Sequence, residues 1–309
     1  MSNPELNDPL VAIIGPTGVG KTEVSILLAE KFNGEIICAD SRTLYKGMEI
    51  GTAKPTMEDR QRIPHHLLDV TTPDKPWSLA LFQVNAQVVI QDIYNRGKIP
   101  FFVGGSGQYF RAATQAWSPP AVPPNQKLRS VLELLVNKNG VSSLYKFLSL
   151  LDPQTAAEID RNNSRRLIRA LEVILISGKP FSNQRIRLTC LYKMINIGLT
   201  RPRVDLYERV DKRVDAMFAN GLVQEVRGLL EQGYSQELPA MSAIGYKECI
   251  DYITGVVTLE QAKEEVKRKT RIYIRKQANW FKPEDPTIHW FNISEENLDS
   301  IINYISSKI

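Results

Sequence analysis

The chain is poor in cysteine and has no long apolar run, and each absence excludes a class of protein. Its three cysteines, Cys38, Cys190 and Cys249, form no Cys-x-x-Cys pair, so neither a disulfide framework nor a zinc site is indicated. No apolar run reaches the length of a membrane-spanning helix, and the N-terminal segment lacks the pattern of a secretory leader. We therefore expect a cytoplasmic, monomeric protein with no membrane partner.

An excess of charge of either sign is also lacking, because 39 lysines and arginines against 34 acidic residues leave a net charge of only +5. The distribution of the basic residues says more. Four arginines lie within residues 161–169, and eight lysines and arginines lie within residues 263–282 against two glutamates. Basic clusters of this kind are typical of surfaces that bind nucleic acid.

A glycine-rich loop follows the first apolar segment, residues 10–14. It reads Gly-Pro-Thr-Gly-Val-Gly-Lys-Thr and matches the phosphate-loop pattern G-x-x-x-x-G-K-[ST]. The glycines let successive N–H groups converge on one anion, and a helix beginning near Lys21 adds the positive end of its dipole. Phosphate binding is therefore predicted for the whole loop, with Lys21 as the point charge and Thr22 as a ligand of Mg²⁺: Gly15, Pro16, Thr17, Gly18, Val19, Gly20, Lys21 and Thr22. A glycine-rich turn without a ligand is the alternative, and the order of strand, loop and helix disfavours it.

Alternating strand and helix patterns predict the fold. Residues 35–40, 99–103, 194–199 and 288–291 have the pattern of buried strands, and a helical pattern lies between the first two. This predicts an α/β class, a doubly wound parallel sheet of the P-loop type. Capping signals place helix starts at Asp152-Pro153, Ser164 and Thr258.

A proline-rich segment predicts the domain boundary. Four prolines in residues 117–124 favour an extended connector, and only helical patterns follow as far as about residue 180. We therefore expect an inserted all-helical domain over residues 117–189. Residues 1–116 and 190–309 would then form the P-loop α/β core with its C-terminal basic helices.

Asp40 is the conspicuous acid beside the loop, since it follows the second strand at the carboxyl edge of the predicted sheet. It is either a general base or the N-cap of the next segment, and its place favours the base. The third strand runs into residues 104–107, Gly-Gly-Ser-Gly, with no carboxylate. This argues against a motor or a switch GTPase. Ser106 lies at the same edge, either as a functional hydroxyl or as part of a plain turn.

Beyond the phosphate loop, several further segments carry a family resemblance. They are residues 40–55 (DSRTLYKGMEIGTAKP), 65–69 (HHLLD), 103–109 (VGGSGQY) and 169–173 (RALEV). With the loop, they make the chain resemble the tRNA dimethylallyltransferases of the bacterial and organellar type over about residues 11–282. Those enzymes transfer a prenyl group to an adenosine. This chain has Ser106 where the family usually has threonine.

The resemblance implies the reaction and its residues. The phosphate loop would bind dimethylallyl diphosphate, and the acceptor would be the exocyclic amine, N6, of adenosine 37, just 3′ of the tRNA anticodon. Asp40 would take the amine proton. Ser106 and Arg213 would stabilise the departing diphosphate together with Lys21 and Mg²⁺, although Arg209, one helical turn before Arg213, is an equal candidate and either could be a solvated surface residue.

The resemblance also implies where tRNA binds. Residues Ser41, Arg42 and Thr43, with Asp40, would meet the extruded adenosine. Arg129, Arg165, Arg166 and Arg169 would contact the tRNA from the helical domain. Pairing of these arginines with local acids such as Glu172 is the alternative. Lys267, Arg271 and Arg275 recur along one side of a long basic helix and offer a further RNA surface, or a solvated face.

Three other functions remain compatible with parts of this pattern. A small-molecule kinase also joins a phosphate loop to an aspartate after the second strand, but it leaves the basic clusters unexplained. A prenyltransferase acting on free AMP or ADP needs no RNA-sized surface. A non-catalytic RNA-binding protein that senses nucleotide has no use for Asp40 beside the loop.

Overall fold

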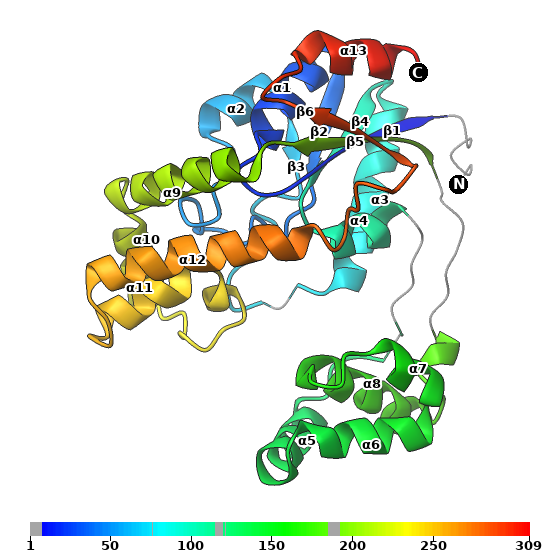
Figure 1. Ribbon diagram of the computed structural model, residues 1–309, viewed down its shortest axis with the longest axis vertical. Helices are drawn as coiled ribbons and strands as arrows, with labels where there is room; N and C mark the ends of the chain where they lie inside the picture. Colours follow the sequence, from blue (N-terminus) through cyan, green and yellow to red (C-terminus); the bar gives the residue numbers. More distant parts are fainter. Residues whose placement is uncertain (1–7, 76, 115–119, 121, 185–191) are drawn as a thin grey trace. The chain divides into compact units, whose positions relative to one another are not determined.

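Six strands form one parallel sheet in the computed structural model of the protein (Figure 1), which describes residues 8–75, 77–114, 120, 122–184 and 192–309. The strand order is β3-β2-β4-β1-β5-β6. In register, Val11 of β1 lies between Phe101 of β4 and Ile195 of β5. The strands are β1 (Pro9–Ile14), β2 (Gly34–Cys38), β3 (His65–His66), β4 (Ile99–Gly104), β5 (Lys193–Thr200) and β6 (Ile288–Asn292).

Both faces of the sheet are covered by helices, which explains why its strands are apolar runs and not alternating patterns. Helices α1 (Lys21–Lys31) and α13 (Leu298–Ser306) pack on one face, where Ile13 and Ile197 meet Ile26 and Ile301. Helices α3 (Leu79–Asn95) and α4 (Gly107–Thr114) pack on the other. The predicted doubly wound α/β fold is confirmed.

A helical layer continues from the carboxyl edge of the sheet. Helix α9 (Arg203–Ala219) packs beside the long α12 (Leu259–Gln277), and α10 (Leu222–Glu231) packs against α11 (Tyr246–Ile253) (Figure 1). Two small elements, α2 (Met57–Arg62) and the 3-10 turn η2 (Ala240–Ser242), complete this part. The carboxylate of Glu225 in α10 accepts the N–H groups of Glu49, Ile50 and Gly51, and so attaches the segment after β2 to this layer.

The chain divides into two compact units, residues 1–114 with 190–309, and residues 115–189. The second unit is helical: α5 (Gln126–Asn139), α6 (Val141–Leu151), α7 (Pro153–Glu158), α8 (Ser164–Ser177) and the 3-10 turn η1 (Ser182–Gln184). Its core contains Leu132, Leu148, Leu167 and Leu171. The predicted junctions at 116/117 and 189/190 lie outside the described residues. The same is true of Cys190 and of residues 117–119 and 121 in the proline-rich segment.

Two predicted helix starts are confirmed and one is wrong. Asp152 caps α7 with Pro153 at its first position, and Thr258 with Gln261 forms the capping box of α12. The cap of α8 is Asn163, whose side chain accepts the N–H of Arg166, while Ser164 is the first helical residue. Asparagine caps as well as serine does, so two adjacent candidates could not be separated by residue type.

Candidate active site

The phosphate loop joins β1 to α1 at the carboxyl edge of the sheet. Gly15, Gly18 and Gly20 all have positive φ, and a Cβ on Gly15 would lie 2.5 Å from the carbonyl oxygen of Leu199. Only glycine therefore fits this backbone. Gly20 is the N-cap of α1 and makes no side-chain cap, so the first N–H groups of the helix keep their capacity to bind an anion.

Lys21 folds back onto this loop. Its Nζ donates to the carbonyl oxygens of Gly15 and Pro16, at 3.0 and 2.9 Å. Burial lowers the pKa of Lys21 to about 8, the carboxylate of Asp40 opposes that effect, and the charge of Arg213 adds to it. Lys21 is thus a partly buried cation in an electropositive pocket, which favours an anionic ligand.

Asp40 follows β2 and lines the same cavity. Its Oδ1 accepts the N–H of Arg42 at 2.8 Å, which makes a local turn, and no helix begins there. The N-cap interpretation of Asp40 is therefore wrong. No described residue donates a hydrogen bond to its Oδ2, so one carboxylate oxygen is left for a ligand.

Both candidate arginines of α9 line the cavity, but they are held differently. Arg209 is exposed, and its Nε donates to the carbonyl oxygen of Gly18 at 3.1 Å. Burial lowers the pKa of Arg213, and Asp40 opposes this shift. Arg213 is therefore the more enclosed cation and lies within electrostatic reach of Asp40, whereas Arg209 is tied to the loop backbone.

One cavity of about 510 Å³ contains these groups. Of the residues predicted for the site, it is lined by Thr17, Gly18, Gly20, Lys21, Thr22, Asp40, Thr43 and Arg213. Gly15, Pro16, Val19, Ser41, Arg42 and Ser106 are not among its lining residues. Ser106 lies directly before α4, where its carbonyl oxygen accepts the N–H of Phe110 at 3.0 Å. The side chain of Arg42 turns toward residues 239–242, where it donates to the carbonyl oxygen of Pro239 at 2.7 Å.

Several further lining residues had no predicted role in the site. Thr52, Ala53, Pro55 and His65 lie in segments that carry the family resemblance, whereas Cys38, Lys212, Tyr273 and Gln277 lie in none of them. Burial raises the pKa of the Cys38 thiol to about 12, and Asp40 adds to the shift, so this cysteine stays protonated and is no nucleophile. Tyr273 and Gln277 come from the last two turns of α12. Tertiary structure alone brings them beside a loop at the other end of the chain.

An ion-pair network holds the cavity wall at residues 52–55. The side chain of Lys54 is 1% exposed, and its Nζ bonds to the carbonyl oxygen of Tyr45 and to the carboxylates of Glu49 and Asp69. Arg60 bonds to the same two carboxylates. A buried lysine with three oxygen partners is satisfied, so this network fixes a wall that has no regular secondary structure.

The cavity suits Mg²⁺ bound with a phosphorylated ligand better than Mg²⁺ bound by protein alone. Within the described ranges, no group of three or more His, Cys, Asp or Glu side chains could hold a metal. Mg²⁺ usually takes one or two protein oxygens together with substrate phosphates and water. Thr22, which is exposed at the cavity, offers such an oxygen.

The four arginines predicted to contact tRNA from the helical unit divide into two pairs. Arg129 and Arg169 clasp the fully buried carboxylate of Glu172, each at 2.8 Å, and these bonds lower the pKa of Glu172 to about 2 against its burial. For these two the local-acid alternative is the one found. Arg165 and Arg166 are exposed and form no ion pair within the described part of the chain.

Fewer cations of the long basic helix α12 are unpaired than its sequence indicates. Lys267 pairs with Asp215 at 2.9 Å, and Arg271 pairs with Asp211. Both acids belong to the neighbouring α9, so the expectation that few acids balance α12 is wrong. The sequence of α12 alone does not reveal these acidic partners, because Asp211 lies 60 residues before Arg271 in the chain.

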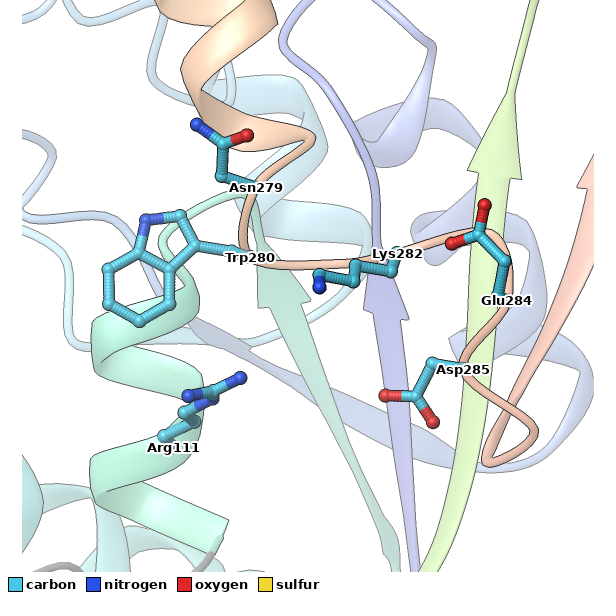
Figure 2. A pocket seen from close by; sticks show the side chains of 6 residues that line it. All are labelled: Arg111, Asn279, Trp280, Lys282, Glu284 and Asp285. Carbon is cyan, nitrogen blue, oxygen red and sulfur yellow. The ribbon is translucent and has the colours of Figure 1, made fainter. Parts of the chain in front are cut away.

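A second, smaller cavity of about 250 Å³ lies beyond the end of α12 (Figure 2). It is lined by Arg111, Asn279, Trp280, Lys282, Glu284 and Asp285. Figure 2 shows Arg111 of α4 below the indole ring of Trp280, and the guanidinium carbon is 5.4 Å from the ring centroid. Its two cations are matched by two carboxylates, and it lacks a glycine loop, so the larger cavity is the candidate active site.

A parallel sheet with a glycine loop at the end of β1, facing a carboxylate and two arginines, defines a P-loop protein that acts on a phosphorylated substrate. The chain belongs to the IPP transferase family, whose model matches residues 43–284.

Similar proteins carry consistent names. A tRNA dimethylallyltransferase of a Roseiflexus species is 49% identical over 274 residues, 89% of this chain and 90% of the relative. That of Halalkalibacterium halodurans is 41% identical over 311 residues, 98% of both chains. The crystal structure of a tRNA isopentenylpyrophosphate transferase from Bacillus halodurans has a TM-score of 0.73 at 40% identity, covering 98% of this chain and 96% of that one. A eukaryotic dimethylallyltransferase acting on tRNA has a TM-score of 0.82 at 29% identity, covering 98% and 80%. Within the described ranges, no helix is long and apolar enough to cross a bilayer.

Proposed function

We propose that the protein is a tRNA dimethylallyltransferase. It would transfer the dimethylallyl group of dimethylallyl diphosphate to N6 of the adenosine 3′ of the anticodon, adenosine 37, and release diphosphate. The observation that carries this proposal is the single cavity in which the phosphate loop, Asp40 and Arg213 meet. The names of its relatives favour this activity over that of a kinase or of an enzyme for free AMP.

The reaction needs an anion site for the leaving group. As the amine nitrogen bonds to the allylic carbon, the carbon–oxygen bond to diphosphate breaks, and negative charge grows on the departing oxygen. The loop N–H groups, Lys21 and Arg213 are fixed donors on that side of the cavity, and preorganised donors are the most effective stabilisers of developing charge. Bound Mg²⁺, held by Thr22 and phosphate oxygens, would supply further positive charge.

The acceptor amine needs a base. Asp40 keeps one carboxylate oxygen, Oδ2, without a donor among the described residues, and it would accept the amine proton as the new nitrogen–carbon bond forms. Such proton transfer contributes about 10²–10⁴-fold in rate. Ser106 directly follows Gly104 and Gly105, which line the cavity, and its hydroxyl would contact the diphosphate.

The tRNA side is supported by charge. Arg165 and Arg166 sit in the first turn of α8, where the helix dipole disfavours cations, and they lack ion-pair partners within the described chain. A polyanionic partner would compensate them. Because the proposed substrate is tRNA, we expect a cytoplasmic enzyme.

The deciding experiment incubates the protein with unmodified tRNA, dimethylallyl diphosphate and Mg²⁺, and looks by mass spectrometry for a five-carbon adduct on the anticodon-loop adenosine. The Asp40→Asn variant keeps the turn to Arg42 but removes the base. It should bind both substrates normally while kcat falls about 10²–10⁴-fold. An adduct on free AMP alone, or ATP turnover with a small alcohol, would refute the proposal.

A further inference from the structure

Gln277 is the last residue of α12, and its side chain touches both loops of the candidate active site. Its Oε1 accepts the N–H of Thr17 in the phosphate loop at 2.8 Å. Its Nε2 donates to the carbonyl oxygen of Gly105 at 3.2 Å. The residue is only 5% exposed. One buried carboxamide therefore joins two segments that are 172 and 260 residues away in sequence.

The chemistry of this contact requires a planar group with a donor on one side and an acceptor on the other. A carboxamide has both, whereas an ionised carboxylate only accepts, and an aliphatic side chain does neither. The turn is shaped for this group as well. A Cβ on Gly105 would lie 2.1 Å from the Nε2 of Gln277, so only glycine leaves room for the amide.

The contact also uses one backbone amide of the phosphate loop. The N–H of Thr17 donates to Gln277, and Thr17 lines the cavity together with Gly18, Gly20 and Lys21. On the other side, Gly105 directly precedes Ser106. A fixed distance between Thr17 and Gly105 therefore fixes the distance between the phosphate loop and the serine turn.

We propose that Gln277 is a positioning residue that holds these two loops at the spacing needed to bind diphosphate. The proposal rests on the proposed function, because it assumes that the loop receives a diphosphate. Gln277 itself touches no reacting atom. Its loss should therefore weaken diphosphate binding through the loop and leave the tRNA surface unchanged.

The test compares Gln277→Leu, Gln277→Glu and the control Gln261→Leu with the wild-type chain. Gln261 is an exposed glutamine of the same helix, and its hydrogen bonds with the described residues are those of the N-terminal capping box. For each protein, calorimetry gives the Kd for inorganic diphosphate with Mg²⁺, and filter binding gives the Kd for tRNA. Diphosphate binding requires no prenyl transfer, so a chain that binds diphosphate normally but modifies no tRNA overturns the proposed function alone.

Loss of one hydrogen-bonded bridge should weaken diphosphate binding of Gln277→Leu about tenfold, while its tRNA affinity and the diphosphate affinity of Gln261→Leu change less than about twofold. Gln277→Glu adds a readout that a merely structural role would not move. Its carboxylate cannot donate to Gly105 at about pH 8. Because burial at this position disfavours the ionised form, a growing fraction is protonated and able to donate as pH falls toward about 5, so its deficit against wild type should shrink. Equal losses for both ligands, a diphosphate loss below about threefold, or a deficit of Gln277→Glu independent of pH would overturn the inference.

Discussion

At the scale of single residues, the site is built around a lysine that the fold partly buries. Lys21 has its pKa lowered to about 8, first by burial and then by Arg213. Burial destabilises the charged form of Lys21 in the free protein. A bound diphosphate offsets this effect, because its negative charge favours the charged form of the lysine. Ligand binding and protonation of Lys21 are therefore coupled.

This coupling predicts how binding depends on pH. Below about pH 8 the free lysine is already charged; above it, binding must take up a proton, so affinity for Mg²⁺-diphosphate should fall by up to about tenfold per pH unit. Calorimetry between pH 7 and about pH 10, in buffers of different ionisation enthalpy, measures both the affinity and the proton uptake.

Lys21→Arg is the matched control, because arginine stays charged throughout this range. It should bind more weakly than wild type but without the additional fall above about pH 8, which also corrects for titration of the diphosphate itself. A wild-type curve parallel to that of Lys21→Arg would contradict the coupling.

Residues near a recognisable motif could be predicted from sequence, and residues from distant segments could not. The loop pattern located Lys21 and Thr22, and strand position located Asp40. Nothing in the sequence near Gln277 or Tyr273 indicates a cavity, because their role depends on where the end of α12 meets the sheet. Residues 40–55 carry the family resemblance, but the sequence does not show that Lys54 forms ion pairs with Glu49 and Asp69.

At the scale of elements, α8 and α5 are joined by a buried carboxylate. Glu172 is fully buried and is satisfied by Arg129, Arg169 and the N–H of Asn125. Its low pKa means that this contribution to stability is complete above pH 4.5, the ordinary value, and is lost as pH falls toward about 2. The helical unit should therefore be acid-sensitive in that window.

Replacing Glu172 by Gln tests this role. Two arginines that share a carboxylate would lose it, and we expect a loss of about 2–4 kcal/mol in the free energy of unfolding of the helical unit. Stability should also depend less on pH between 4.5 and about 2. Urea titrations followed by circular dichroism measure both, with exposed Glu133→Gln of α5 as the control. Equal stability of the two variants would show that the cluster is unimportant.

The presence of a helix or strand could be predicted more reliably than its end residues or the elements that pack against it. Strong apolar runs located β1, β2, β4, β5 and β6, whereas the two-residue β3 is too short to produce a pattern. The cap of α8 was misplaced by one residue. The sequence of α12 contains too few acidic residues to pair with its cations. The acids that pair with them, Asp211 and Asp215, belong to α9, and the sequence of one helix does not reveal which helix packs beside it.

At the scale of the whole molecule, the two units carry different kinds of chemistry. The α/β unit holds the cavity, and the helical unit presents Arg165 and Arg166 to solvent. If these arginines meet the tRNA backbone, they act by releasing counterions, and that contribution depends on salt and not on sequence.

The double variant Arg165→Ala, Arg166→Ala should therefore reduce the slope of log Kd against log salt for tRNA by roughly 1 to 2. Its affinity for Mg²⁺-diphosphate should not change, because the loop belongs to the other unit. Filter binding at several potassium chloride concentrations measures the slope. The exposed pair Lys127→Ala, Lys138→Ala of α5 removes the same charge and is the control; identical slopes for the two variants would assign the effect to net charge alone.

The bond between Thr17 and Gln277 has a consequence for synthesis. The loop is synthesised before the end of α12 that contacts it, and the entire helical unit is synthesised between them. A nascent or prematurely terminated chain thus has its phosphate-binding motif without the wall that completes it. Partial products of translation should bind diphosphate weakly, and activity should appear only when the end of α12 reaches the loop.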